Sequence, residues 1–524
     1  MRTAAARHRL WSGGLPPRWL MVALVMMGTS ALPGQDRDDL TAALAVQRTF
    51  VRAIKRSETS VVSIARVRRS RVLTQPAATN PFGLRFRNRN LATERQDPTS
   101  PEFIPSDFGS GIVIADPEHK DRRLILTDYH VVRGGPPDGE SKSRSPYAIY
   151  VRFADKRGYE ASIVAADPRS DLAVLSIDFS ALGIGPSDVK PIRFAESPAF
   201  HKGQLVLALG NPYAIARDGS ASASWGMISN MSRRPAPVTG SPLDPEARRK
   251  ETIHHFGTLL QVDTRLNLGT SGGALLNLRG ELIGITTSLA ALNGYETSVG
   301  YAVPLNAATK RIITSLIRGH EVEYGFLGVQ PRDVSPAELR RLSDSIAQSS
   351  AAMCVRVFAN SPARLGGLQP GDIVLEVNGH RVTGRYDLMR LIGELGPGTT
   401  ARLRVWRGRE RSLRVSLGKW PVFDEDGIIA TRPRHRPWRG LLVDYSTARS
   451  KFIPYPYQYH QAVVALRVDA RSSADRAELK AGDFITHVNK TAVRTPHEFY
   501  RAVAALNGKV TLTLADGRRL ILQP

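Results

Sequence analysis

Cysteine is almost absent from this 524-residue chain: Cys354 is its only cysteine, which excludes an intrachain disulfide. Runs of five or more like charges and recognisable nucleic-acid motifs are also missing, so we expect no nucleic-acid partner. After the N-terminus, no apolar stretch approaches the about 20 residues that a membrane span needs. The composition has no biased tract that would indicate a fibre or disorder, and the length predicts two to four globular domains.

The N-terminus has the pattern of an export signal. The apolar run WLMVALVMMGTSAL (19–32) ends in small residues. It is preceded by four arginines, Arg2, Arg7, Arg9 and Arg18. Residues 1–33 are therefore predicted to be a signal peptide, with an uncleaved N-terminal anchor as the alternative. The net charge of +24 fits a scattered basic surface, and peripheral association with an anionic membrane surface is the other interpretation.

From residue 108 to about 305 the chain reads as many short strands without intervening helices. Examples are GSGIVIA (109–115), RLILTDYHVV (123–132), DLAVLSI (171–177) and LIGITT (282–287), with Gly, Pro and Asp clustered between them. This pattern predicts an all-β barrel or sandwich over residues 108–320. A helix and a first strand are expected in residues 34–69, followed by a polar loop over 70–107.

The last two hundred residues contain a repeat. GLQPGDIVLEVNGHRV (367–382) matches ELKAGDFITHVNKTAV (478–493) at a constant offset, because 483 − 372 = 111. A period this long indicates tandem domains, predicted at 322–420 and 438–524 with a linker at 421–437. The second copy carries the insertion KFIPYPYQYH (451–460), which either exposes aromatic side chains to a partner or packs on its own domain.

The stretch NLGTSGGALLN (267–277) raises the question of whether Ser271 is a nucleophile. Residues 269–273 formally match the G-x-S-x-G turn of α/β-hydrolases, which requires a helix after the serine and the histidine later in the chain. The sequence after Ser271 instead reads as a hairpin that turns at Arg279-Gly280. An esterase of that fold is therefore disfavoured.

The order His130, Asp171, Ser271 is that of a chymotrypsin-type barrel. A serine hydroxyl needs a base for its proton, and an imidazole can act first as base and later as acid. The imidazole in turn needs a carboxylate that fixes its tautomer. Each residue alone is more often structural, but the three in this order predict an acyl-transfer site. The glycines of the loop allow backbone N–H groups to converge, and we assign the oxyanion hole to the N–H groups of Gly269 and Ser271.

Several blocks of the sequence resemble the HtrA/DegP family of trypsin-like serine proteases. They are LTDYHVV, DPRSDLAVLSI, LLQVDTRLNLGTSGGALLNLRGELIGITT and GYAVPLNAATKRI, and the repeated module resembles the PDZ domain of that family. The resemblance implies a mainly β fold: a chymotrypsin-like double β-barrel followed by two PDZ domains, which are small, partly open α+β barrels. It implies His130 as base, Asp171 as its partner and Ser271 as nucleophile.

The resemblance also implies a function. We expect an exported, ATP-independent endopeptidase of misfolded or unfolded proteins, periplasmic or anchored facing the periplasm, that binds peptide C-termini and forms trimers or larger homo-oligomers. No cofactor is implied. The alternative from a different class is a PDZ-based chaperone or binding protein whose protease site is latent.

Four positions depart from the usual family pattern. Thr270 stands where Asn is common, Ala274 where Pro is frequent, and Asp128 where Asn is frequent. Arg265, six residues before Ser271, corresponds to the floor of the primary specificity pocket in trypsin-like folds. An arginine in that pocket would favour acidic residues, whereas an arginine that points to solvent would leave the preference unchanged.

A PDZ domain holds a terminal carboxylate with backbone N–H groups of one loop. In the first copy the loop is predicted at Leu327, Gly328 and Val329, and in the second around Gly440. Arg439 replaces an apolar residue there, so the second domain is either a weaker binder or a module for oligomer contacts. His254 and His255, with Glu251 nearby, do not form a recognisable ligand set, and no metal is predicted.

Overall fold

The computed structural model describes residues 35–68, 105, 107–119, 121–133, 147–153, 158–179, 188–211, 220–235, 251–287, 300–342, 346, 348–453 and 458–524. The chain divides into two units, residues 1–52 and 53–524. The described part of the first unit is helical and belongs to α1 (Gln35–Ser57). The predicted signal segment 1–33 and nearly all of the predicted loop 70–107 lie outside the described residues. Within the described part of the chain, no helix is long and apolar enough to cross a membrane.

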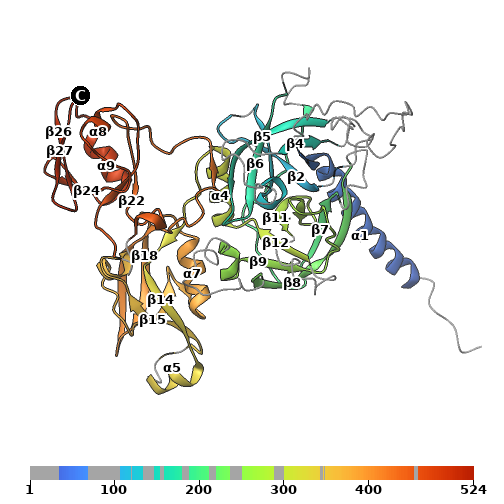
Figure 1. The fold of residues 1–524 in the computed structure, drawn as a ribbon. Coiled ribbons are helices and arrows are strands. Elements are labelled where there is room, and N and C mark those ends of the chain that lie inside the picture. Colours follow the sequence, from blue (N-terminus) through green and yellow to red (C-terminus); the bar gives the residue numbers. More distant parts are fainter. Residues whose placement is uncertain are drawn as a thin grey trace, which may run out of the picture. The chain divides into compact units, whose positions relative to one another are not determined.

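A first closed barrel forms early in the second unit (Figure 1). Its antiparallel strands follow the order β5-β4-β1-β2-β3-β6, and β6 pairs back with β5. The strands are short and rich in apolar residues, and most of the residues in β2, β3 and β6 are buried. The strands are β1 (Val61–Arg68), β2 (Asp107–Ala115), β3 (Arg123–Asp128), β4 (Tyr147–Arg152), β5 (Gly158–Asp167) and β6 (Leu172–Ile177).

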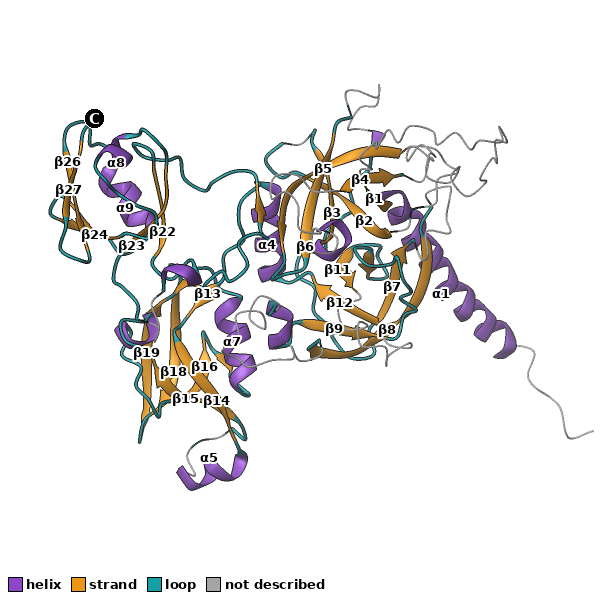
Figure 2. Cartoon of the chain, viewed as in Figure 1, coloured by secondary structure: helices purple, strands orange, loops and turns teal. Residues whose placement is uncertain are grey.

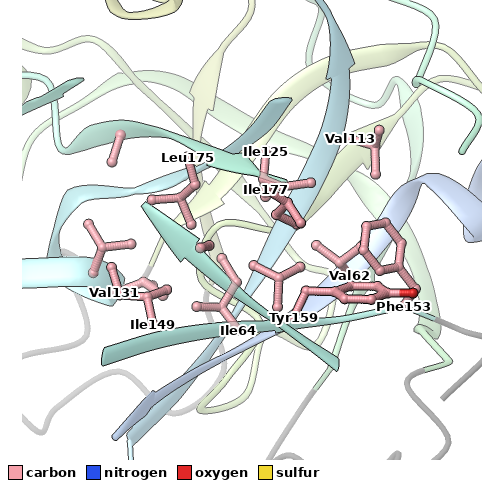
Figure 3. Packing of buried hydrophobic residues seen from close by; sticks show 14 of the residues in the cluster. Val62, Ile64, Val113, Ile125, Val131, Ile149, Phe153, Tyr159, Leu175 and Ile177 are labelled. Atoms are coloured by element: carbon pink, nitrogen blue, oxygen red, sulfur yellow. The ribbon is translucent and has the colours of Figure 1, made fainter. Parts of the chain in front are cut away.

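Branched aliphatic side chains fill this barrel. Figure 3 shows Ile64, Ile125 and Leu175, from three different strands, pointing into one cluster. Tyr159 and Phe153 pack edge to face with ring centroids 5.6 Å apart. Burial of such side chains stabilises a fold by about 1.5–3 kcal/mol each, so this core fixes the strand ends on which the site depends.

A second closed barrel follows in the order β10-β11-β12-β9-β8-β7. The predicted double barrel is therefore confirmed, and the hairpin after Ser271 is present as β10 and β11. The helix α4 (Ala307–Ile317), capped by the side chain of Asn306, follows the barrel and contacts β5 and β6. The strands are β7 (Leu205–Gly210), β8 (Ser222–Arg233), β9 (Leu259–Val262), β10 (Ala274–Leu276), β11 (Leu282–Thr287) and β12 (Gly300–Pro304).

The first repeated module has a five-strand path, β14-β15-β16-β18-β19, with the helix α7 (Arg385–Gly393) packed on it. The short strand β13, at the start of the module's sequence, pairs with the short strand β20 at its end. The remaining elements are β13 (Gly325–Phe326), β14 (Val329–Val334), α5 (Pro336–Leu342), β15 (Ala351–Val357), α6 (Pro362–Leu365), β16 (Ile373–Val377), β17 (His380–Arg381), β18 (Thr400–Trp406), β19 (Glu410–Ser416) and β20 (Gly418–Lys419).

The second module repeats this arrangement (Figure 2). Its central strand, short strand and long helix begin 111 positions after those of the first, at 484, 491 and 496 against 373, 380 and 385. The elements are β22 (Leu441–Tyr445), β23 (Val463–Val468), α8 (Ser473–Arg476), β24 (Phe484–Val488), β25 (Thr491–Ala492), α9 (Pro496–Val503), β26 (Val510–Leu514) and β27 (Arg519–Leu522).

The segment predicted as a linker between the modules contains a strand. β21 (Ile429–Ala430) pairs antiparallel with β5 of the first barrel, opposite Ala166 and Ala165. Isolated two-residue strands are too short to be recognised from sequence, because their stability comes from the edge that they join.

A buried ion cluster joins the first module to the second. The side chain of Lys419 is 2% exposed, and its Nζ lies 2.8 Å from Asp444 Oδ2, 3.1 Å from Glu321 Oε1 and 3.2 Å from Glu323 Oε1. Arg449 reaches the other oxygen of Glu321 at 2.6 Å. Buried charges of this kind persist only when they are paired, so the cluster depends on all of its members.

Candidate active site

His130 lies where β3 ends and the short helix α2 (Tyr129–Arg133) begins. Two groups of His130 contact the same carboxylate. Its backbone N–H donates to Asp171 Oδ1 at 3.0 Å, and its Nδ1 lies 2.8 Å from Asp171 Oδ2 and 3.1 Å from Oδ1. With Nδ1 held by Asp171, Nε2 is the ring nitrogen left for proton exchange with other groups.

Asp171 stands in the turn before β6 with a positive φ of 53°, which is uncommon for a residue other than glycine. Its carbonyl accepts a hydrogen bond from the N–H of Tyr129 at 2.8 Å, and its Oδ2 accepts one from the Thr287 hydroxyl at 3.3 Å. The side chain is 3% exposed. These contacts hold the carboxylate against His130, although the two residues are 41 positions apart in the chain.

The surroundings of His130 raise its pKa from 6.5 to about 9. Burial works in the opposite direction, since it disfavours the imidazolium. The charge of Asp171 and its hydrogen bond to the ring outweigh that effect, and Asp128 adds to the rise. The site therefore stabilises an imidazolium, the form that a base takes after it accepts a proton.

Ser271 lies on the loop that leads into β10, and a single serine of β2 holds this loop. The N–H of Ser110 donates to the Ser271 carbonyl at 2.8 Å, and the Ser110 hydroxyl donates to the Gly269 carbonyl at 2.8 Å. The same hydroxyl accepts from the N–H of Asn211 at 2.9 Å. Thus Ser110 connects the two barrels directly beneath the loop.

The loop has a tight turn in which Thr270 N–H donates to the Asn267 carbonyl at 3.1 Å. Gly269 has a φ of 95° at the third position of this turn, where a type II turn requires a positive φ. A Cβ at Gly269 would lie 2.6 Å from the Asn211 carbonyl oxygen and from the Phe108 ring. Only glycine fits this position, which is one of the two predicted oxyanion donors.

The loop also adjoins the end of β3, two residues before His130. A Cβ at Gly272 would lie 2.4 Å from Thr127 Oγ1 and 3.2 Å from the Asp128 nitrogen. The structure therefore brings the loop of Ser271 to the strand end that carries His130, and it brings His130 to Asp171. Ser271 itself is 7% exposed.

Arg265 and His254 are not part of this pair. Arg265 is exposed, and its carbonyl oxygen lies 3.3 Å from the Ser224 hydroxyl, which donates to it. Its role in specificity stays a prediction. His254 is buried between Thr258 Oγ1, at 2.6 Å, and the Ser170 carbonyl, at 2.8 Å. Those contacts give His254 a structural role beside the turn of Asp171.

The two predicted carboxylate loops have matching hydrogen bonds. In the first, Gly328 has a φ of 80°, and the carbonyl of Leu327 accepts from the N–H of Ala363 at 2.8 Å. In the second, Gly440 has a φ of 82°, and the carbonyl of Arg439 accepts from the N–H of Ala474 at 3.2 Å. The backbone of the loop is therefore built in the same way in both modules.

Arg439, the unusual residue of the second loop, has a structural role. Its guanidinium donates to the carbonyls of Gly508 at 2.7 Å and Leu522 at 2.9 Å, and to two further carbonyls. The described end of the 451–460 insertion packs on the first module: Tyr459 is 5% exposed, with its ring 5.5 Å from that of Phe326.

Sequence reasoning missed Ser110 and Thr287. Ser110 had a local signal, since it stands between two glycines in GSGIVIA, a pattern typical of close backbone approach. Thr287 is one of two threonines at the end of an ordinary strand, and nothing in the sequence distinguishes it. A metal is not favoured at His130 and Asp171, because an ion bound to both would displace the proton that joins Nδ1 to Oδ2.

Three family models match the chain in the order of its folded parts. A trypsin-like peptidase domain matches residues 109–285, and two PDZ domains match residues 325–417 and 464–516. Similar curated proteins include a probable periplasmic serine endoprotease DegP-like from Ectopseudomonas mendocina, 27% identical over 95% of this chain and 96% of the relative. The chain therefore has a trypsin-like peptidase domain followed by two PDZ domains, and the curated proteins that it is similar to are named DegP-like serine endoproteases.

Other comparisons name proteins of the same kind. The DegP-like endoprotease of Halomonas elongata is 29% identical over 76% of this chain and 74% of its own length. Among solved structures, the HtrA-type protease AlgW with a tripeptide has a TM-score of 0.47 and 23% identity, covering 71% of this chain and 97% of that one. The trypsin-like peptidase domain and the DegP-like serine endoprotease relatives together show that the protein is a serine endopeptidase.

Proposed function

We propose that the protein is a periplasmic endopeptidase of unfolded or misfolded proteins in which Ser271, His130 and Asp171 act as nucleophile, base and orienting carboxylate. The observation that carries the assignment is the double contact of His130 with Asp171, through its backbone N–H and Nδ1. It is supported by the Ser110 contacts, which hold the Ser271 loop close to the same strand end. The periplasmic location is proposed from the names of the relatives.

Hydrolysis then proceeds by acylation of Ser271 followed by deacylation. Ser271 Oγ attacks the scissile carbonyl carbon while its proton passes to His130 Nε2, and the oxyanion is stabilised by the N–H groups of Gly269 and Ser271. Collapse of this intermediate breaks the C–N bond, and His130 gives its proton to the leaving amine. A water molecule then attacks the acyl-enzyme, losing a proton to His130, and collapse of the second intermediate breaks the C–O bond to Ser271, whose Oγ takes that proton back from His130 as the carboxylic acid leaves.

The PDZ domains supply the client-binding part of the proposal. The first is assigned to capture of peptide C-termini at Leu327, Gly328 and Val329, because the N–H groups of Leu327 and Gly328 have no acceptor among the described residues. The second is a poorer candidate, because Arg439 replaces the apolar residue of this loop and its guanidinium is bound to the carbonyls of Leu522 and Gly508. Assembly into homo-oligomers is proposed on the family resemblance.

Active-site labelling with a fluorophosphonate, followed by mass-spectrometric location of the adduct, tests the assignment. The adduct is expected on Ser271, and Ser271→Ala should lose both labelling and casein degradation. Ser222→Ala, an exposed serine of β8, is the matched control and should keep both. An adduct elsewhere, or equal casein degradation by Ser271→Ala, would refute the site and favour a binding protein or chaperone instead.

A further inference from the structure

Asp128 is a buried acid without a hydrogen-bond donor. It is the last residue of β3, its exposure is 0%, and neither carboxylate oxygen has a hydrogen-bond partner among the described residues. Its two polar neighbours have other acceptors, since Gly272 N–H donates to the Thr286 carbonyl at 2.8 Å and the Thr287 hydroxyl donates to Asp171 Oδ2 at 3.3 Å, but both lie close enough to Asp128 to favour its ionised form. An ionised carboxylate in such a position is costly.

Asp128 lies beside His130 and Asp171, the two residues of the proposed triad that share a proton. One carboxylate oxygen of Asp128, one carboxylate oxygen of Asp171 and one ring nitrogen of His130 all lie within 4.8 Å of one another. Two carboxyl groups and one imidazole at this separation titrate as a unit, because each added negative charge disfavours the next. A local arrangement of this kind is not needed to bury a strand end, for which an uncharged residue would suffice.

We propose that Asp128 is a positioning residue that competes with His130 for one proton and so sets the pH range in which His130 is free to act as a base. This inference rests on the proposed function of His130. Two arrangements have the same total charge. In one, Asp128 is neutral and His130 can accept the serine proton. In the other, Asp128 is ionised, and His130 already carries the proton.

The charges around the cluster are consistent with this competition. Burial and then the charge of Asp171 raise the pKa of Asp128 well above its ordinary value, while His130, Gly272 and Thr287 oppose that rise. Burial lowers the pKa of His130, and Asp171 and Asp128 outweigh it. Arg66, on β1, opposes protonation of His130. The titratable and charged groups that face the pair are Asp171 and Arg66.

Asp128→Asn is the decisive variant, because an amide keeps the shape of the side chain and removes its ability to ionise. We expect the acidic limb of the pH profile of kcat/KM to move to lower pH by about 1–2 units, the effect of one charge at this distance. At pH 7 the variant should then be about tenfold or more active than the native chain. A merely structural role would change kcat or stability without moving this limb.

A second measurement reads the same coupling without catalysis. In histidine-labelled Ser271→Ala protein, the His130 signal, assigned by its loss in His130→Gln, is titrated by NMR with and without Asp128→Asn. A lower His130 pKa in the double variant supports the inference. An unchanged His130 pKa, or an unmoved kcat/KM limb in an active Asp128→Asn enzyme, overturns it. Failure of the proposed site is seen separately, as retained activity in Ser271→Ala.

Discussion

Asp171→Asn should remove nearly all peptidase activity, and the structure explains the direction of the effect. The native carboxylate accepts from both the His130 backbone N–H and Nδ1. An amide has one oxygen, so only one of these contacts can be kept. If the amide oxygen faced Nδ1, the amide NH₂ would face the buried backbone N–H of His130. Both groups are donors, so the backbone N–H would lose its acceptor, at a cost of about 1–3 kcal/mol. The favoured orientation therefore donates to Nδ1 and moves the imidazole proton to Nε2, where it blocks acceptance of the serine proton.

The magnitude follows from the lost charge. At the 2.8 Å separation of Nδ1 and Oδ2, an effective dielectric constant of about 20 gives roughly 6 kcal/mol of stabilisation for the imidazolium. Since about 1.4 kcal/mol corresponds to a factor of ten, kcat/KM should fall by about 10⁴-fold.

The assay is hydrolysis of an internally quenched peptide, together with the rate of fluorophosphonate labelling at Ser271. Thr287→Val is the matched control, because it removes the 3.3 Å hydrogen bond to Asp171 but keeps the carboxylate, and it should cost about tenfold or less. Circular dichroism and thermal unfolding establish that both variants are folded. If Asp171→Asn stays within tenfold of the native enzyme, Asp171 does not fix the tautomer of His130 and the reasoning fails.

Three further outcomes are expected. Ser110→Ala leaves the Asn211 N–H and the Gly269 carbonyl without their shared partner, so Ser271 labelling should slow by about tenfold or more, and an unchanged rate would contradict the anchoring role. Lys419→Met leaves buried carboxylates unpaired and should lower stability to denaturant by about 3–5 kcal/mol in the unfolding transition that includes the two modules. Burial raises the pKa of Cys354 to about 12, so iodoacetamide at pH 8 should modify it only after unfolding, and rapid labelling of the native chain would show that the thiol is accessible.

The ion cluster also predicts a loss of stability in acid. Burial opposes ionisation of Glu321, but the charges of Lys419 and Arg449 outweigh it, so the pKa of Glu321 lies below its ordinary value. A carboxyl group with a depressed folded-state pKa stabilises the fold above its unfolded pKa, and the contribution is lost as the pH falls toward the folded value. Denaturant midpoints measured from pH 7 to pH 3 should therefore fall more for the native chain than for Lys419→Met, and equal slopes would contradict this account.

Patterns between neighbouring residues determined a large part of this protein. Runs of β-branched and aromatic residues separated by Gly, Pro and Asp predicted the short strands, the glycines around Ser271 predicted a tight loop, and the 111-residue offset predicted two tandem modules. Strand and turn are local features that depend on residues a few positions apart, and the repeat is read by comparing two segments of the sequence with each other. Chain order and residue type were enough to propose His130, Asp171 and Ser271 as a set.

Only the tertiary structure decided which groups meet. Ser110 contacts Gly269 across 159 positions, β21 joins an edge of the first barrel, and Lys419 lies among carboxylates contributed by both modules. The approach of Asp128 and His130 to Asp171 is a result of the same kind. Such contacts depend on how the closed barrels and the modules bring distant segments together, and no local pattern in the sequence records that approach.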